Sequence, residues 1–236
     1  MLKLNSSKSM VVGIIAVFFI NCSGGNGKVQ EKNKATDTKS TITANKKQDN
    51  ASVDTSQAIF NIPIEGYKAT ELGQAVYTGN IVKVQTLINK GASIEKCLTD
   101  ETYIYDILYT ALVFNKVELV NYILRNKLYS SVNKTYTEES ETPLTLACGL
   151  HDTSNALEIA DTLIALGADA NGTGESGGEN TKYPLLIAVN QRNAGLTKLL
   201  IKHGAKKDIK NQAGETPLAI AQKKGFEDIT GILKGD

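Results

Sequence analysis

The sequence predicts an all-α repeat solenoid of about five units, in which each unit is a helix-turn-helix. Three observations predict it. A leucine returns in steps of 36, 36, 41 and 33 residues, at positions 72, 108, 144, 185 and 218. An alanine stands three residues after each of these leucines, and a Leu-Ile-x-x-Gly-Ala string begins at Leu87, Leu163 and Leu200. A unit of this size cannot bury its own apolar face, so the units are expected to stack.

The first element is an export signal over residues 1–21. Lys3 and Lys8 precede an apolar run of eleven residues, Met10 to Ile20. A basic start followed by a short apolar stretch is the layout of a secretory signal. The run is too short for an ordinary membrane-spanning helix, which needs about 20 apolar residues.

Cys22 directly follows this run. The string Phe19-Ile20-Asn21-Cys22 resembles a bacterial lipobox, although Asn21 and Phe19 replace the usual Ala or Gly and the usual Leu. The resemblance implies cleavage before Cys22 and acylation of its thiol with chains such as palmitate. Two or three such chains anchor a protein stably to a membrane, here on the periplasmic side or at the cell surface. The alternatives are a plain signal peptide or an uncleaved anchor, with Cys22 incidental.

A flexible polar tether follows, so that residues 22–58 hold the lipidated cysteine and a spacer. Lys, Asn, Thr, Ser, Gln and Asp dominate the stretch from Ser23 to Gln57, which contains no aromatic residue. Such a segment cannot bury enough apolar surface to offset the entropy lost on ordering. We expect it to serve as a spacer and nothing more.

The repeat domain spans residues 59–236, and its helix boundaries have local causes. Thr142 and Thr216, each followed by Pro-Leu, can cap a helix with the hydroxyl group, and proline suits the first helical position. Gly79, Gly225 and Asn115 stand where a helix should end, and each can take the left-handed conformation found there. The recurring alanines allow neighbouring first helices to approach closely.

These Asn-x-x-Gly-x-Thr-Pro-Leu and Leu-Ile-x-x-Gly-Ala strings resemble ankyrin repeats, whose unit of roughly 33 residues is a β-hairpin finger and two antiparallel helices. The resemblance implies five repeats, with the first and last acting as caps, at about 66–98, 102–134, 138–171, 179–209 and 212–235. The second lacks Thr-Pro and the Gly-Ala ending. The third has about four extra residues near His151–Leu157 between its helices, and Gly172–Asn180 lengthen the next finger. We expect Ile59–Ile64 to cover the open end of the first repeat.

Composition and motifs exclude several function classes. A formal net charge of +1 argues against a dedicated nucleic-acid binder. Two histidines, His151 and His203, leave little material for a histidine-based metal centre, and three cysteines exclude a disulfide-dense scaffold. We expect Cys97 and Cys148 to be free thiols, because two repeat steps separate them by more than disulfide reach. Gly172–Gly177 match the G-x-G-x-x-G spacing but lack the surrounding strand and helix that a dinucleotide site needs. We expect no catalytic residue, no bound metal and no cofactor.

Ankyrin proteins are generally binding scaffolds, so the resemblance implies contacts from finger tips and from the exposed start of each first helix. The residues at those positions are Tyr67, Tyr77, Thr102, Tyr103, Tyr105, Tyr136, Glu138, Glu139, Glu141, Glu179 and Lys182. Tyrosine gives an interface rigid contact area with a polar end, although strands also favour it. The glutamates could steer a basic partner or simply solvate a finger tip.

We therefore predict an exported, lipid-anchored and non-catalytic scaffold that acts as a monomer and binds a protein partner through its finger tips and concave face. Two other classes stay open. The first is an immunity-like or accessory protein that protects or inhibits an exported enzyme or toxin, which predicts a tight one-to-one complex. The second is a hydrolase that uses His151 with a neighbouring carboxylate, which predicts a pocket in the inserted segment.

Overall fold

The computed structural model describes residues 59–137, 141–173 and 183–235, and these contain ten helices that pack in five consecutive pairs. The first helices of the pairs are α1 (Glu71–Tyr77), α3 (Ile107–Val113), α5 (Pro143–Cys148), α7 (Pro184–Asn190) and α9 (Pro217–Lys223). The second helices are α2 (Ile81–Asn89), α4 (Val117–Arg125), α6 (Thr153–Ala165), α8 (Ala194–Lys202) and α10 (Glu227–Lys234).

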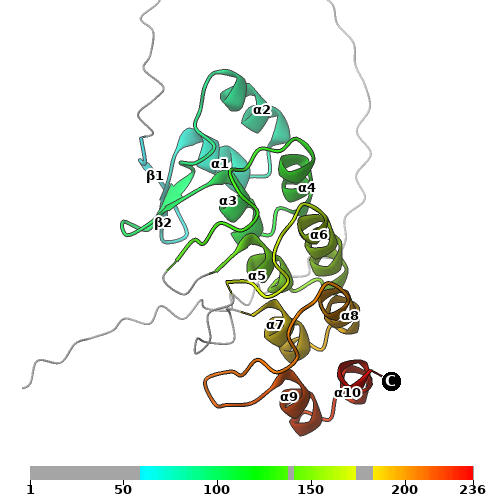
Figure 1. Cartoon of the computed structure of the whole chain (residues 1–236). Coiled ribbons are helices and arrows are strands. Elements are labelled where there is room, and N and C mark those ends of the chain that lie inside the picture. Colours follow the sequence, from blue (N-terminus) through cyan, green and yellow to red (C-terminus); the bar gives the residue numbers. More distant parts are fainter. Residues whose placement is uncertain (1–58, 138–140, 174–182, 236) are drawn as a thin grey trace, which may run out of the picture. The chain divides into compact units, whose positions relative to one another are not determined.

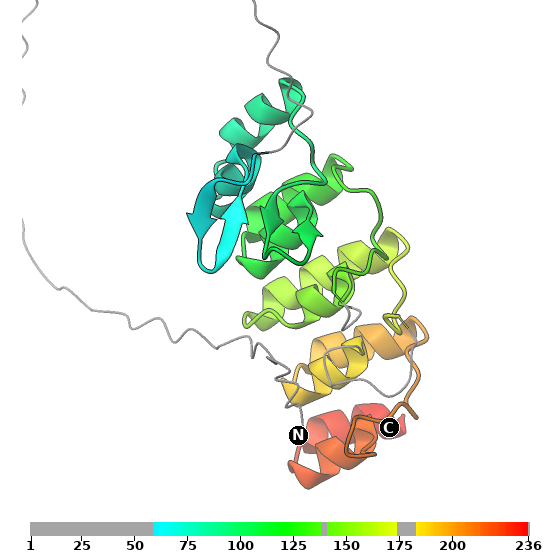
Figure 2. The same cartoon turned by 90° about the vertical axis from the view of Figure 1, so that its left-hand side faces the viewer.

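The pairs stack in chain order and form two layers (Figures 1 and 2). In one layer α1 packs on α3, α3 on α5, α5 on α7 and α7 on α9. In the other layer α4 packs on α6, α6 on α8 and α8 on α10. Each pair therefore contacts only its neighbours, which is the arrangement expected of a repeat solenoid. None of the helices in the described ranges is long and apolar enough to cross a membrane.

Side-chain caps begin most of the first helices as the sequence predicts. The hydroxyl groups of Thr142 and Thr216 accept hydrogen bonds from the N–H groups of Thr145 and Ala219, and a proline follows each cap. Asp106 replaces threonine in the second pair, where its carboxylate accepts from the Tyr109 N–H at 2.8 Å. An unpaired N–H at a helix start is satisfied in each case.

The predicted helix ends are also confirmed. Gly79 and Gly225 have φ values of 72° and 67°, and Asn115 has a φ of 51°. In the fourth pair Arg192 takes the same left-handed conformation with a φ of 54°, although the sequence gives no hint of it. The Asn193 N–H next to it binds the Ala188 carbonyl at 2.9 Å, the same turn hydrogen bond that follows α1, α3 and α9.

A small antiparallel sheet lies beside α1 and α3, on the side away from α2 and α4 (Figure 1). Its strands, in spatial order, are β1 (Ile62–Ile64), β2 (Tyr67–Ala69), β3 (Leu98–Thr99) and β4 (Ile104–Tyr105). A two-residue turn at Glu65 and Gly66, with φ values of 42° and 89°, joins β1 to β2. Two successive positive φ values are typical of the tight turns that suit a twisted hairpin.

The sheet modifies two predictions. Within the expected cover Ile59–Ile64, only Ile62–Ile64 form a strand that packs on α1, while Ile59 is 69% exposed. Strand-built fingers occur in the described residues only before α1 and α3. The finger before α5 is instead closed by the Tyr136 N–H bound to the Glu141 carbonyl at 3.0 Å.

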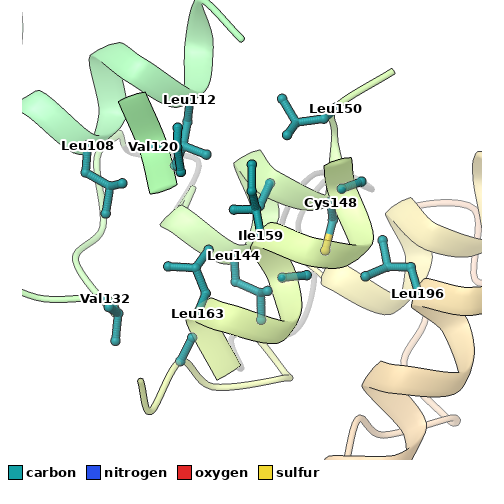
Figure 3. Packing of buried hydrophobic residues seen from close by; sticks show 14 of the residues in the cluster. Leu108, Leu112, Val120, Val132, Leu144, Cys148, Leu150, Ile159, Leu163 and Leu196 are labelled. Atoms are coloured by element: carbon teal, nitrogen blue, oxygen red, sulfur yellow. The ribbon is translucent and has the colours of Figure 1, made fainter. Parts of the chain in front are cut away.

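The main core lies between the two helix layers and runs through all five pairs. Figure 3 shows its middle, where Leu144 of α5 lies beside Ile159 and Leu163 of α6. The recurring alanines at 75, 111, 147, 188 and 221 are buried, as predicted from the close approach of the first helices. Cys97 and Cys148 are free, and both are buried.

Two asparagines tie neighbouring repeats together on the finger side. Asn133 donates from Nδ2 to the Gly167 carbonyl at 2.9 Å, and its Oδ1 accepts from the Asp169 N–H at 2.8 Å. Asn171 repeats this bond to the next turn, where its Oδ1 accepts from the Lys206 N–H at 2.9 Å. Each asparagine thus satisfies backbone groups that the next helix end leaves unpaired.

The extra residues of the third pair extend a helix and do not form the expected loop between helices. Asp152 caps α6, which has 13 residues where α4 and α8 have nine. Leu157, which directly follows the added turn, lies against α8 at Gly195, where a Cβ atom would approach a Leu157 methyl group to 3.1 Å. The glycine therefore leaves room for the Leu157 side chain. Residues 174–180 of the lengthened finger lie outside the described residues.

Candidate protein-interaction surface

Seven aromatic side chains from the first three repeats form one continuous contact network, which we call the aromatic row. Its members are Tyr77, Phe114, Tyr67, Tyr103, Tyr105, Tyr109 and Tyr136. Tyr105 stacks on Tyr109 with ring centroids 4.0 Å apart, and Tyr109 meets Tyr136 edge-on at 4.8 Å. Aromatic pairs in such geometries stabilise by about 0.5–1.5 kcal/mol beyond the area they bury.

The elements of the first three repeats place these rings along one side of the stack. Tyr67 begins β2, Tyr105 ends β4, and Tyr109 is the third residue of α3. Because β4 runs almost directly into α3, Tyr105 and Tyr109 stack on each other. Tyr77 ends α1 and packs edge-on against Phe114 just after α3 at 4.8 Å.

Burial divides the aromatic row into a floor and a rim. Tyr105, Tyr109 and Tyr136 form the floor, with only 2%, 4% and 5% of their surface exposed. The rim consists of half-buried side chains, namely Tyr67, Tyr77, Tyr103 and Phe114. The rim rings therefore rest on a packed layer and still offer part of their surface to a partner.

Three of the phenols donate to carboxylates. Tyr77 Oη binds Glu65 Oε1 at 2.8 Å, and Tyr105 Oη binds Asp100 Oδ2 at 2.7 Å. Tyr136 Oη binds the buried Asp106 Oδ1 at 3.2 Å. The hydrogen bond to Glu65 and its negative charge raise the pKa of Tyr77. These charge-assisted bonds fix the orientation of the rings.

Two lysines lie over tyrosine rings of the row. Lys116 Nζ is 5.4 Å from the Tyr77 centroid, and Lys134 Nζ is 5.8 Å from the Tyr136 centroid. Lys134 also bridges Asp106 Oδ2 at 3.0 Å and a Glu95 carboxylate oxygen at 2.7 Å. Burial lowers the pKa of Lys134, but hydrogen bonding to Glu95 and the charge of Asp106 outweigh it, so the pKa is raised.

The structure brings together part of the predicted partner-binding set. Tyr67, Tyr77 and Tyr103 lie on the rim, and Thr102 is exposed at the finger tip, where its N–H binds Asp100 Oδ1. Glu141 is half-buried beside this surface. These residues stay predictions as partner contacts. Four other predicted positions lie outside the described residues, namely Glu138, Glu139, Glu179 and Lys182. Cys22, the predicted lipidation site, also lies outside them.

Tyr105 and Tyr136 require a correction. Both were expected on the presenting surface, but both are buried in the floor of the row. Burial raises the pKa of each phenol, and the carboxylates of Asp100 and Asp106 add to the effect. Their side chains hold the rim in place and have no surface left for a partner.

Sequence reasoning missed Tyr109 and Phe114. When the five repeats are aligned on their leucines, the position of Tyr109 is small or aliphatic in the other four. The matching residues are Gly73, Thr145, Leu186 and Ala219. Phe114 stands where three other repeats have Thr78, Gln191 and Lys224. The available signal was therefore an aromatic residue at an aligned position that is not aromatic in the other repeats.

The described residues offer little for catalysis. They contain no group of three or more His, Cys, Asp or Glu side chains arranged to hold a metal ion. His151 is exposed just before α6. Burial raises the pKa of the Cys97 and Cys148 thiols, which disfavours the reactive thiolate.

A shallow groove between α6 and α8, lined by Leu157 and Leu199 among others, lies on the layer opposite the row. The half-exposed aromatic rim is suited to binding.

Known proteins agree with this architecture. A family model described as ankyrin repeats, in three copies, matches residues 153–235, which include the last two helix pairs and α6. XBAT35 of Arabidopsis thaliana, which carries the name of an E3 ubiquitin-protein ligase, is 36% identical over 96 residues. The NF-kappa-B p105 subunit of Gallus gallus is 28% identical over 177 residues.

The chain matches 41% and 75% of its own length to these two proteins but spans only 20% and 17% of theirs. The chain covers a larger share of the ankyrin repeat protein YahD of Escherichia coli than of these two proteins. YahD is 31% identical over 156 residues, which cover 64% of this chain and 71% of YahD. Together with the stacked helix pairs, this similarity shows that the chain belongs to the ankyrin-repeat family.

Proposed function

We propose that this protein is a non-catalytic scaffold that is exported, anchored to a bacterial membrane by a lipid on Cys22, and bound to a protein partner through the aromatic row. Ankyrin repeats imply a protein partner, and the observation that selects the surface is the division of the row into floor and rim. Aromatic side chains that are rigid and half-exposed supply much of the binding energy at protein interfaces. An interface also costs less to form when its side chains are ordered beforehand.

All five helix pairs are proposed to be ankyrin repeats, two more than the family model matches. Three features support this count. The first two pairs carry the same in-phase leucine and buried alanine as the last three. They end their first helices with Gly79 and Asn115 in the left-handed conformation. Their first helices also pack in the same layer as the other three.

Replacement of rim tyrosines tests the partner surface. The variant Tyr77→Ser/Tyr103→Ser leaves the buried floor intact, and Tyr122→Ser/Tyr129→Ser is a matched control because these two half-buried tyrosines lie in and just after α4. Immobilised full chains are exposed to an envelope extract of the native cell. We expect the wild type and the control to retain one protein that the rim variant loses. Retention of the same proteins by all three chains would refute the assignment of the surface.

Export and lipid anchoring rest on the sequence of residues 1–22 alone. The test is a Cys22→Ser chain produced in the native cell and followed by fractionation. The variant should leave the membrane fraction, since acyl chains on Cys22 are the proposed anchor. Continued membrane partitioning of the variant would contradict lipidation.

The immunity-like or accessory role would use the same surface. The observation that favours it is the preorganisation of the row, since hydrogen bonds to Glu65, Asp100 and Asp106 already fix its phenols. Preorganised surfaces lose less entropy on binding, as a tight inhibitor requires. Size-exclusion chromatography distinguishes the roles: the free chain should elute as a monomer. A protector or inhibitor should co-elute one-to-one with an exported enzyme or toxin at nanomolar concentration, whereas a weaker scaffold complex should dissociate.

A further inference from the structure

The aromatic row has a consistent electrostatic character. Carboxylates accept hydrogen bonds from the hydroxyl groups of Tyr77, Tyr105 and Tyr136, so each phenol lies beside a negative charge. A phenol that donates to a carboxylate gains electron density on its ring. Such a ring attracts a cation over its face more strongly, because the attraction follows the negative charge of the π system.

Cations of this chain already use two of these rings. The ammonium groups of Lys116 and Lys134 lie over Tyr77 and Tyr136, the first and last tyrosines of the row. Between them, Tyr67 meets Tyr105 and Phe114 in edge-to-face geometry, with ring centroids 5.9 Å and 6.1 Å apart. In the described part of the chain, no lysine or arginine lies over the Tyr67 ring.

The charges around the row are unbalanced. Four carboxylates bind a phenol of the row or Lys134, namely those of Glu65, Glu95, Asp100 and Asp106. In the described ranges two lysines, Lys116 and Lys134, lie over rings of the row. Lys68 pairs with Glu101 at 2.6 Å, while Lys134 pairs with Glu95 and Asp106. Within the described ranges no ion pair engages Glu65 or Asp100.

We propose that the partner of the aromatic row is a basic protein segment whose arginine or lysine side chain lies over Tyr67, between Glu65 and Asp100. This inference rests on the proposed function and adds the chemistry of the partner. The half-exposed rim supplies the apolar contact that the side-chain stem needs, and the carboxylates supply the opposite charge. The same charges would repel nucleic acid and anionic lipid.

The direct test uses labelled peptides as probes and the full chain in detergent. One peptide carries several arginines separated by glycine and serine. A second replaces each arginine by citrulline, which is neutral and nearly the same shape, and a third replaces each by glutamate. Fluorescence anisotropy should show the arginine peptide binding at least ten-fold more tightly than either control. Its affinity should fall when salt is raised from about 50 mM to about 300 mM, because exposed charges are screened.

Variants locate the binding site. Glu65→Gln keeps an acceptor for Tyr77 and removes the charge, and Tyr67→Leu keeps apolar area and removes the π face. Each should weaken the arginine peptide about two- to five-fold, the range expected for one exposed cation–π contact. The matched controls Glu227→Gln in α10 and Tyr122→Leu in α4 should leave the affinity unchanged.

Two kinds of outcome would overturn the proposal. Equal binding of the arginine and citrulline peptides, or tighter binding of the glutamate peptide or of anionic vesicles, would exclude a cation site. Arginine binding that none of the row variants weakens would place the site elsewhere. The proposed function is tested separately. Suppose that the wild type retains an envelope protein, that the rim variant loses it, and that excess arginine peptide does not displace it. That result would support the aromatic row as the interaction surface and would contradict a basic partner segment.

Discussion

Gly73 in α1 is the glycine at which an added methyl group should destabilise the fold most. A Cβ atom on Gly73 would lie 2.0 Å from the carbonyl oxygen of Cys97 and 2.8 Å from its carbonyl carbon. Ordinary contacts of this kind begin above 3 Å, so the backbone at Cys97 or α1 must move by about 1 Å. That carbonyl accepts from the Thr70 N–H at 3.0 Å and from the Thr70 hydroxyl at 3.4 Å. The shift would weaken both hydrogen bonds.

The expected loss of stability combines two destabilising effects and one stabilising effect. Overpacking a buried site costs about 1–3 kcal/mol, and each weakened hydrogen bond costs about 0.5–1.5 kcal/mol. Alanine is favoured over glycine in a helix by about 1 kcal/mol, which acts in the other direction. We expect Gly73→Ala to lower the free energy of unfolding by about 1–5 kcal/mol. For a domain of this length, that corresponds to a fall of about 2–20 °C in the unfolding temperature.

Gly231→Ala in α10 is the matched control, because no atom lies within 4 Å of the added methyl group. It should raise the stability by up to about 1 kcal/mol. Urea unfolding followed by circular dichroism measures both variants. Hydrogen exchange should add that Gly73→Ala loosens the amides of α1, β2 and β3 and leaves α9 and α10 unchanged, since repeats contact only their neighbours. A Gly73→Ala chain as stable as the wild type would refute the reasoning.

Three further predictions follow from single contacts. Lys134→Met leaves the buried Asp106 carboxylate without its cation and should destabilise by about 1–3 kcal/mol in urea; a loss below about 0.5 kcal/mol would contradict this. Hydrogen bonds from Lys223 and Asn211 lower the pKa of Glu215 from 4.5. The contribution of Glu215 to the free energy of unfolding is therefore present above pH 4.5 and lost as the pH falls through the lowered pKa. Glu215→Gln should remove this pH dependence of stability, as an NMR-monitored acid titration can show. The Cys148 thiol should resist maleimide until the chain unfolds, and rapid labelling of the native chain would show that the site opens.

The buried tyrosines show why the candidate site was only partly predictable. The sequence places Tyr103 and Tyr105 two residues apart in a finger, but it does not say which face of the strand meets the helices. Tyr105 is buried because Tyr109 stacks on one side and Asp100 accepts its hydroxyl, while Tyr103 stays half-exposed. Tyr136 enters the same floor from a finger 31 residues along the chain, through its contact with Asp106.

The sequence by itself determined the repeat frame. The leucine period is read directly from the sequence, because the same local unit recurs along the chain. The caps at Thr142 and Thr216 and the left-handed ends at Gly79 and Gly225 depend on residues within one turn of each other, so local rules predict them. Only the tertiary structure decided which tyrosines are buried, that the insertion before Leu157 extends α6, and that Lys134 bridges two repeats. The Tyr136 contact with Asp106 and the Lys134 bridge join residues more than 20 positions apart, whose distance is fixed by how one repeat stacks on the next. Tyr105 is closer in sequence to Tyr109 and Asp100, but only the folded finger shows that it contacts them.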